Sequence, residues 1–184
     1  MIFASKEYIV QIKNIFDENF GVDYLTEDEI LFYIKDENSF LIIDLTENRV
    51  NAIVLYIIES IEKVSSITKI PVNNIYELFS KNKLIHCKCL CVKKELQKQG
   101  YGRELFKKSL GFIFSKYDLD IFAILWKYNG IVPAEQIVIE MGFKKLKELP
   151  SPFFNYDNYH CIICNGKCKC PGIFYYLKKQ NYFN

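Results

Sequence analysis

The feature that most constrains this chain is a strand, a polar loop and a helix joined within residues 90–110. An apolar run ends at Val92, and Gly100 and Gly102 open an amphipathic helix after the loop. Main-chain N–H groups at a helix N-terminus form a cradle for a phosphate or pyrophosphate. Glycine permits positive φ and carries no Cβ, so a diphosphate can approach the main chain closely. The order therefore predicts an α/β protein with an anion site between a strand and a helix.

The spacing of these residues differs from the two common nucleotide fingerprints, G-x-x-x-x-G-K-[ST] and G-x-G-x-x-G. It is Val92-x(4)-Gln97-x-x-Gly100-x-Gly102, which resembles the acyl-CoA loop of the GNAT superfamily of N-acyltransferases, V-x(4)-[QR]-x-x-G-x-[GA]. The alternative for such glycines is a tight turn with close strand–helix packing. The resemblance implies that acetyl-CoA binds as cosubstrate at Leu90, Cys91, Val92, Gln97, Lys98, Gln99, Gly100, Tyr101, Gly102 and Arg103.

Residues downstream of the loop extend this resemblance. Residues 121–126 form an apolar strand, and residues 134–143 form a helix that a glycine closes. GNAT proteins have the same strand, followed by a helix that typically reads A-x-x-L-Y-x-x-x-G-F. The positions that match or nearly match this pattern are Ala134, Ile137, Gly142 and Phe143.

Periodicity and turn residues divide the rest of the chain into short elements. We expect helices over 6–20, 26–33 and 72–80, strands over 39–45, 50–58, 84–92 and 173–178, and loops over 60–69 and 150–158. This order is that of an α/β (α+β) GNAT-type fold, a curved mixed β-sheet flanked by helices. We expect one domain over residues 1–184, with a Cys-rich segment and the last strand in residues 151–184.

Composition narrows the class of protein. Half of the 184 residues are hydrophobic and 16% are aromatic, which favours a folded chain with a substantial core. A net charge of +2, without a dense Lys/Arg run, argues against nucleic acid as a partner. No apolar run reaches the ~18 residues of a membrane helix, and residues 1–8 lack signal-peptide features. We therefore expect a cytoplasmic monomer or homodimer without a membrane partner.

The resemblance implies direct transfer of an acetyl group from acetyl-CoA to a primary amine on a small molecule or a protein. Holding both reactants together can supply ~7–11 kcal/mol of the barrier. A main-chain N–H in residues 90–92 would polarise the thioester carbonyl, a base would deprotonate the ammonium, and an acid would protonate the thiolate. The alternative is a non-catalytic GNAT-like module that binds CoA or a partner, because fold alone does not fix function.

The catalytic residues depart from the family pattern. The tyrosine that often serves as acid is replaced by Val138, which has no proton to donate, and Tyr128 is the candidate substitute. The histone-acetyltransferase branch places a glutamate eleven residues before the loop glutamine, where this chain has His86. A neutral histidine could act as base, and the alternative is a strand residue bonded to a neighbour. Glu59 is the alternative base, acting through a water.

Seven cysteines form two groups. Reduced cytosolic thiols at close spacing favour a metal, and four thiolates complete the tetrahedral shell of a structural Zn²⁺. The second pair is C-x-C, so free thiols or redox use remain alternatives. Cys87, Cys89 and Cys91 alternate along their strand, and we expect them on one face as small core residues, opposite His86. The candidate zinc ligands are Cys161, Cys164, Cys168 and Cys170.

Overall fold

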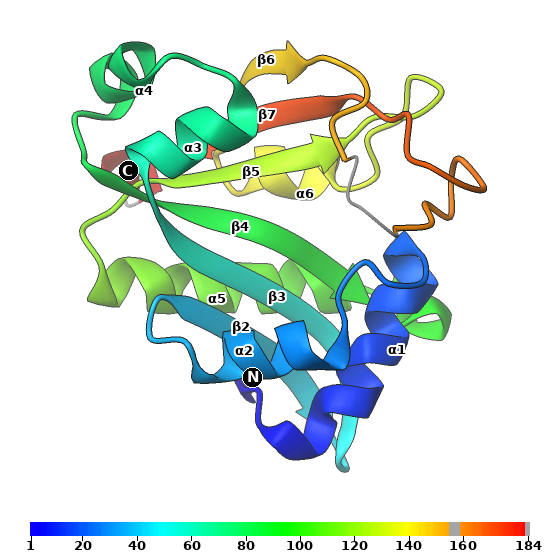
Figure 1. Ribbon diagram of the computed structural model, residues 1–184. Coiled ribbons are helices and arrows are strands. Elements are labelled where there is room, and N and C mark those ends of the chain that lie inside the picture. The colour runs from blue at the N-terminus through cyan, green and yellow to red at the C-terminus, as the bar shows by residue number, and fades with distance from the viewer. Residues whose placement is uncertain (155–158, 183–184) are drawn as a thin grey trace.

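The computed structural model describes residues 1–154 and 159–182, which contain a seven-stranded sheet (Figure 1). Neighbouring strands are antiparallel except β4 and β5, which are parallel, so the prediction of a mixed sheet is confirmed. In spatial order the strands are β1 (Ile2–Phe3), β2 (Ser39–Thr46), β3 (Arg49–Ser60), β4 (Lys83–Val92), β5 (Ile121–Trp126), β7 (Gly172–Leu177) and β6 (Lys144–Leu149).

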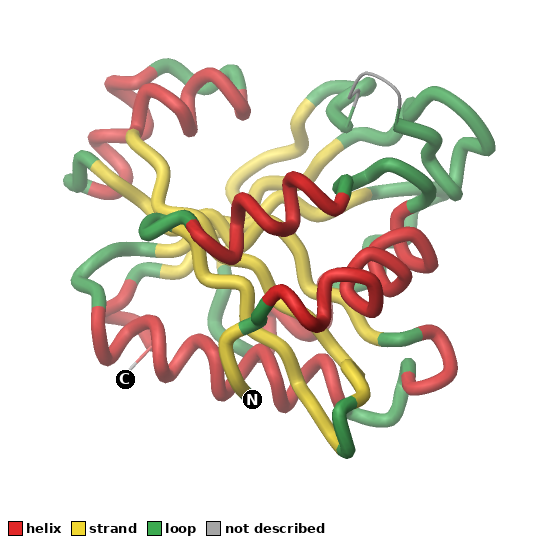
Figure 2. Tube along the Cα trace, turned by 60° about the horizontal axis from the view of Figure 1, so that its bottom comes forward, coloured by secondary structure: helices red, strands yellow, loops and turns green. Residues whose placement is uncertain are grey.

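Helices cover both faces of this sheet (Figures 1 and 2). Within the described residues, none of them is both long enough and apolar enough for a membrane span. Short 3₁₀ turns, η1 (Lys6–Tyr8) and η2 (Lys94–Leu96), precede the first and fifth α-helices. The α-helices are α1 (Ile9–Phe20), α2 (Glu27–Lys35), α3 (Ile61–Thr68), α4 (Val72–Phe79), α5 (Tyr101–Lys116), α6 (Glu135–Glu140) and α7 (Lys179–Tyr182).

The two faces of the sheet carry separate hydrophobic cores. The first core lies under α1 to α4 and includes Phe16, Ile30 and Phe122. The second core lies under α5 and α6 and includes Phe106 and Val138. Because the apolar residues of α5 recur every three or four positions, the helix presents one stripe to the sheet. The sheet is therefore the middle layer of three.

Two predicted segments differ from the structure. Residues 60–69, expected as a loop, contain α3, whose N-terminus is capped by the Ser60 hydroxyl accepting from the Lys63 N–H at 3.3 Å. Burial of Ile61 and Val64 offsets the low helix propensity of its β-branched and serine residues. The charged edge strand β6 was not expected, because five of its six residues are exposed and the strand lacks alternation.

A β-bulge in β4 overturns the prediction that its three cysteines share a face. Leu55 pairs with Cys89 and Tyr56 pairs with Cys87, so Lys88 is an extra residue without a partner on β3. One inserted residue reverses the facing of everything beyond it. Cys87 therefore lies in the second core, whereas Cys89 and Cys91 lie in the first. His86 stacks on Phe122 of the first core, on the same side as Cys89.

Candidate active site

A cavity of about 230 Å³ opens where β4 and β5 separate. The two strands pair only from Ile85–Ile121 to Cys87–Ala123, although both continue beyond these residues. The pairing stops at the bulged Lys88, where β4 bends away from its neighbour. The fold therefore leaves a wedge-shaped gap between two strands in the middle of the sheet.

The cavity draws its walls from both cores. Aromatic residues of α1, the following loop and β5 line it on the side of the first core, and α5 and α6 line it on the other. A small molecule in the gap can thus be reached from both faces of the sheet. The lining residues are Asn19, Phe20, Tyr24, Cys87, Lys88, Cys89, Leu90, Phe106, Ala123, Ile124, Leu125, Trp126, Tyr128, Pro133, Ala134, Val138, Phe154 and Ile163.

Main-chain N–H groups of β4 face this gap. Lys93 donates its N–H to the Asn51 carbonyl on β3 at 2.9 Å. Because successive N–H groups along a strand point to opposite sides, those of Leu90 and Val92 point toward β5. No β5 residue pairs with either of them. Each is positioned to donate to a carbonyl oxygen placed between the strands.

The glycine loop connects the end of β4 to α5 through a compact network. The Gln97 side-chain amide donates to the Asn19 side chain at 3.1 Å and to the Val92 carbonyl at 3.3 Å. Asn19 donates to the same carbonyl at 3.1 Å, which joins the loop to α1. Gln97 therefore holds the loop in shape. Lys98 and Gly100 adopt positive φ angles of 61° and 93°, and no side chain caps α5, so its first N–H groups are available to an anion.

Gly100 and Gly102 are required for different reasons. Gly100 needs its left-handed φ, but a Cβ there would meet no atom within 4 Å. Gly102 is buried, and its Cβ would lie 3.0 Å from Val92 Cγ2 and 4.0 Å from Ile137 Cδ1. Close packing of helix against strand, one of the sequence alternatives, is therefore present at Gly102. It coexists with the open helix N-terminus.

Arg103 lies beside the loop in an ion pair with Glu140 on α6. Its Nε donates to Oε2 at 2.8 Å, and a second guanidinium nitrogen donates to Oε1 at 3.1 Å. Gln136 also donates to Glu140, at 3.0 Å. The pair joins the N-terminal turn of α5 to α6 and is partly solvent-exposed.

Among the three predicted catalytic residues, Tyr128 alone lines the cavity. It follows β5 and forms a main-chain bridge with Ile131, with hydrogen bonds of 3.0 and 2.8 Å. Val138, at the family's tyrosine position, also lines the cavity and is buried. Tyr24 also lines the cavity, and both tyrosines pack in or against the first core.

The two predicted bases lie outside the cavity lining. Burial, reinforced by the nearby Lys88 charge, lowers the pKa of His86 to about 3. Burial raises the pKa of Glu59, an effect that Lys63 and Lys88 partly oppose. Lys88 lines the cavity, and its charge acts on the Glu59 carboxylate. A carboxylate of raised pKa is the better proton acceptor of the two near neutral pH.

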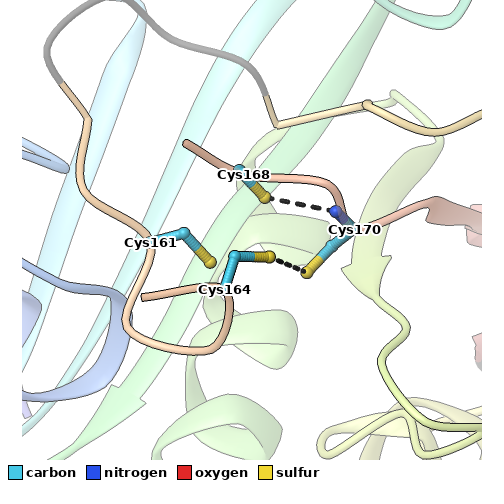
Figure 3. A group of neighbouring side chains, drawn as sticks. All are labelled: Cys161, Cys164, Cys168 and Cys170. Atoms are coloured by element: carbon cyan, nitrogen blue, oxygen red, sulfur yellow. Dashed lines mark hydrogen bonds between the residues drawn. The ribbon is translucent and has the colours of Figure 1, made fainter. Parts of the chain in front are cut away.

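The predicted metal ligands lie close together, in a segment that contacts the end of α1 (Figure 3). The sulfur atoms of all four cysteines lie within 4.8 Å of one another. Main-chain N–H groups of Ile163 and Cys164 lower the pKa of the Cys161 thiol, against the opposing effect of its burial. Ile163, between the first two cysteines, contributes to the cavity wall. The segment thus lies beside the candidate active site.

The sequence did not identify the aromatic wall of the cavity. Phe20 lies 4.2 Å from Tyr24 and 4.9 Å from Trp126 between ring centroids, and Trp126 lies 5.7 Å from Phe154. These four rings come from segments far apart in the chain. The only local signal was the high aromatic content, which does not specify which rings meet.

Comparison with known proteins gives a match in structure alone. No family model and no curated protein sequence matches the chain. Arabidopsis thaliana NAA60 in complex with acetyl-CoA is similar over 93% of each chain, with TM-score 0.66 and 11% identity. A spermidine N-acetyltransferase SpeG mutant from Vibrio cholerae is similar over 100% of this chain and 95% of its own, with TM-score 0.65 and 15% identity.

A third similar structure is the loading GNATL domain of CurA from Lyngbya majuscula. It covers 97% of this chain and 96% of its own, with TM-score 0.67 and 15% identity. Similarity over nearly the whole length shows that the chain has the GNAT fold. The predicted fold class is therefore confirmed.

Proposed function

We propose that this GNAT-fold chain is an acyl-CoA-dependent N-acetyltransferase that transfers acetyl directly to a primary amine. The observation that carries the proposal is the cavity between β4 and β5, which reaches both faces of the sheet. The uncapped start of α5 is on one side of it, and the aromatic wall is on the other. Acetyl-CoA and amine can therefore meet in the gap from opposite faces.

Acetyl-CoA would bind with its pyrophosphate on the main-chain amides of residues 97–102. Its thioester carbonyl would accept the N–H of Leu90 or Val92, which withdraws electrons from the carbonyl carbon. A solved similar structure, that of NAA60, is in complex with acetyl-CoA, which supports the choice of cosubstrate.

The reaction then needs two proton transfers. The amine, once deprotonated, attacks the carbonyl carbon; a C–N bond forms and the C–S bond breaks. We assign the acid that protonates the departing thiolate to Tyr128, because it lines the cavity. We assign the base to Glu59 acting through water, because the pKa of about 3 makes His86 a weak acceptor.

The lining of the cavity favours an amine on an apolar or acidic carrier. Its polar side chains include Asn19 and Lys88, and it contains no carboxylate among the described residues. Lys88 Nζ lies 5.7 Å from the centroid of Tyr24. A polyamine would find no anionic partner there, whereas an aromatic amine or the N-terminus of a peptide would pack on the rings.

The second candidate function is a CoA-binding module without catalysis, which the replacement of the usual acid by Val138 favours. Thioester-cleavage assays with a polyamine, an aromatic monoamine and a peptide with a free N-terminus separate the two. We expect turnover with the aromatic monoamine or the peptide above that with the polyamine. Binding of acetyl-CoA without amine-dependent cleavage in any arm would favour the module, and absence of binding would reject both.

A further inference from the structure

The four clustered cysteines have the arrangement of a tetrahedral thiolate site. A Zn–S bond of about 2.3 Å implies about 3.8 Å between sulfur atoms in a regular tetrahedron. Cys164 Sγ and Cys170 Sγ are 3.6 Å apart, and all four sulfur atoms lie within 4.8 Å (Figure 3). Shifts of about an ångström would complete the tetrahedron. A disulfide, at about 2.05 Å, would join only two of the four.

The backbone around the cysteines is shaped to hold a metal. The chain from Cys161 to Gly166 forms a turn in which Asn165 and Gly166 have positive φ, and the Cys161 N–H donates to the Gly166 carbonyl at 2.8 Å to close it. Cys164 Sγ accepts the Lys169 N–H at 3.2 Å. Amide donors to sulfur stabilise thiolates and fix their direction.

The burial of the cysteines and the charge around them also fit a metal site. Three of the four cysteines are at most 4% exposed, so their thiolates would be costly without a cation among them. Four thiolates and one Zn²⁺ leave two net negative charges. The exposed Lys167 and Lys169 lie within the same segment and offset that charge.

The Cys segment is attached to the end of α1 by main-chain contacts. Tyr159 Oη donates to the Phe20 carbonyl at 2.8 Å, and the Ile162 N–H donates to the same carbonyl at 3.2 Å. Gly21 makes this approach possible, since a Cβ there would lie 2.1 Å from the His160 carbonyl oxygen. The contacts place Ile163 in the cavity wall.

We propose that Cys161, Cys164, Cys168 and Cys170 bind one Zn²⁺ that holds the acceptor-side wall of the cavity in position. The zinc has no open coordination position and takes no chemical part in transfer. Its effect on catalysis rests on the proposed function, but its presence does not. Loss of the metal weakens amine binding and leaves acetyl-CoA binding at the glycine loop unchanged.

Metal content tests the ligand set directly. Protein purified under reducing conditions without added metal should contain about one zinc per chain by elemental analysis. Cys164→Ser should lose it, whereas His160→Ala, beside the cluster, should retain it. If Cys164→Ser does not fold, tetrahedral thiolate absorption bands on replacement by Co²⁺ in the native chain test the same set. Iron in place of zinc, or metal-free protein with a disulfide, would overturn the assignment.

The single tryptophan reports the position of the wall without any substrate. Trp126 lines the cavity and lies against Phe154 and Phe20. Chelation of zinc should shift its emission, and Gly21→Ala should shift it while zinc remains bound. Unchanged emission after complete removal of zinc would overturn the role in the wall.

Kinetics complete the test if amine-dependent turnover is found. Gly21→Ala should raise KM for the amine at least fivefold, with the Kd for acetyl-CoA within twofold of the unmodified protein. An equal loss of affinity for both ligands would overturn the side-specific role. Zinc content and tryptophan emission are measured without turnover. They therefore test the metal site even if the proposed function is wrong.

Discussion

The candidate site has two ends, the glycine loop and the aromatic wall of the cavity, which are built in opposite ways. At the glycine loop, the groups that face a ligand are main-chain amides set by a strand, a turn and a helix in residues 90–102. At the acceptor end, the groups are side chains of Phe20, Trp126, Phe154 and Ile163, which are far apart in the sequence. The first end should tolerate loss of a side chain and resist gain of a Cβ. The second should be sensitive to loss of a side chain.

The largest effect on turnover that this comparison predicts is at Tyr128. Tyr128→Phe removes a hydroxyl from the cavity and keeps the ring, so we expect kcat to fall ~10²-fold, within the usual range for general acid catalysis. Acetyl-CoA affinity should not change. Steady-state kinetics across pH and calorimetry provide the measurement. Tyr24→Phe is the matched control, and a larger loss there than at Tyr128 would assign the acid to Tyr24.

At the main-chain end, Gly102→Val should have the strongest effect. The new side chain meets Val92 at 3.0 Å or closer, so we expect about 1–3 kcal/mol lower stability and at least tenfold weaker acetyl-CoA binding. Calorimetry and chemical denaturation measure both. Gly111→Ala, in the same helix with its nearest atom at 3.8 Å, should leave binding unchanged. A folded Gly102→Val with native affinity would contradict the main-chain cradle.

His86 should affect the pH dependence of stability more than the rate. Its pKa is near 6.5 in an unfolded chain and about 3 in the folded state, so the unfolded state binds the proton first. Its contribution to stability is complete above pH 6.5 and is lost as pH falls toward 3. In His86→Gln, the melting temperature should change less between pH 6.5 and 4 than in the unmodified protein. Turnover should slow less than about threefold. Glu59→Gln should slow turnover more than His86→Gln does. The opposite order would make His86 the base.

The smallest effect should follow removal of a charged side chain at the glycine loop. The Arg103–Glu140 pair is partly exposed, and such pairs contribute about 0.2–1 kcal/mol. We therefore expect Arg103→Ala to weaken acetyl-CoA binding less than about fivefold, as calorimetry in low and moderate salt would show. A loss comparable to that of Gly102→Val would contradict the division between main-chain and side-chain ends.

The same division explains what the sequence could predict. The glycine loop was recognised because its main-chain geometry depends on residues at fixed short spacing, such as Gln97, Gly100 and Gly102. The four zinc-ligand candidates were recognised for the same reason, and the structure brings them together. The aromatic wall depends on which distant segments pack together, and no local pattern encodes that.

The bulge in β4 was missed for a different physical reason. Cys87, Cys89 and Cys91 alternate in sequence, which fits a regular strand with one apolar face. Nothing in the composition marks Lys88 as an inserted residue, because a bulge is defined by pairing with the neighbouring strand. Residues 60–69 were misjudged similarly, since burial of Ile61 and Val64 overrode weak helix propensity.

The gap between β4 and β5 depends on a single inserted residue, Lys88. The two central strands separate because β4 has one residue more than its partner on β3, a difference of a single codon. An in-frame deletion of that codon would return Cys89 and the residues after it to the opposite facing and remove the cause of the separation. A deletion scan should therefore find this codon far less tolerant than codons of the exposed turn between β2 and β3, where chain length does not set the shape of the cavity.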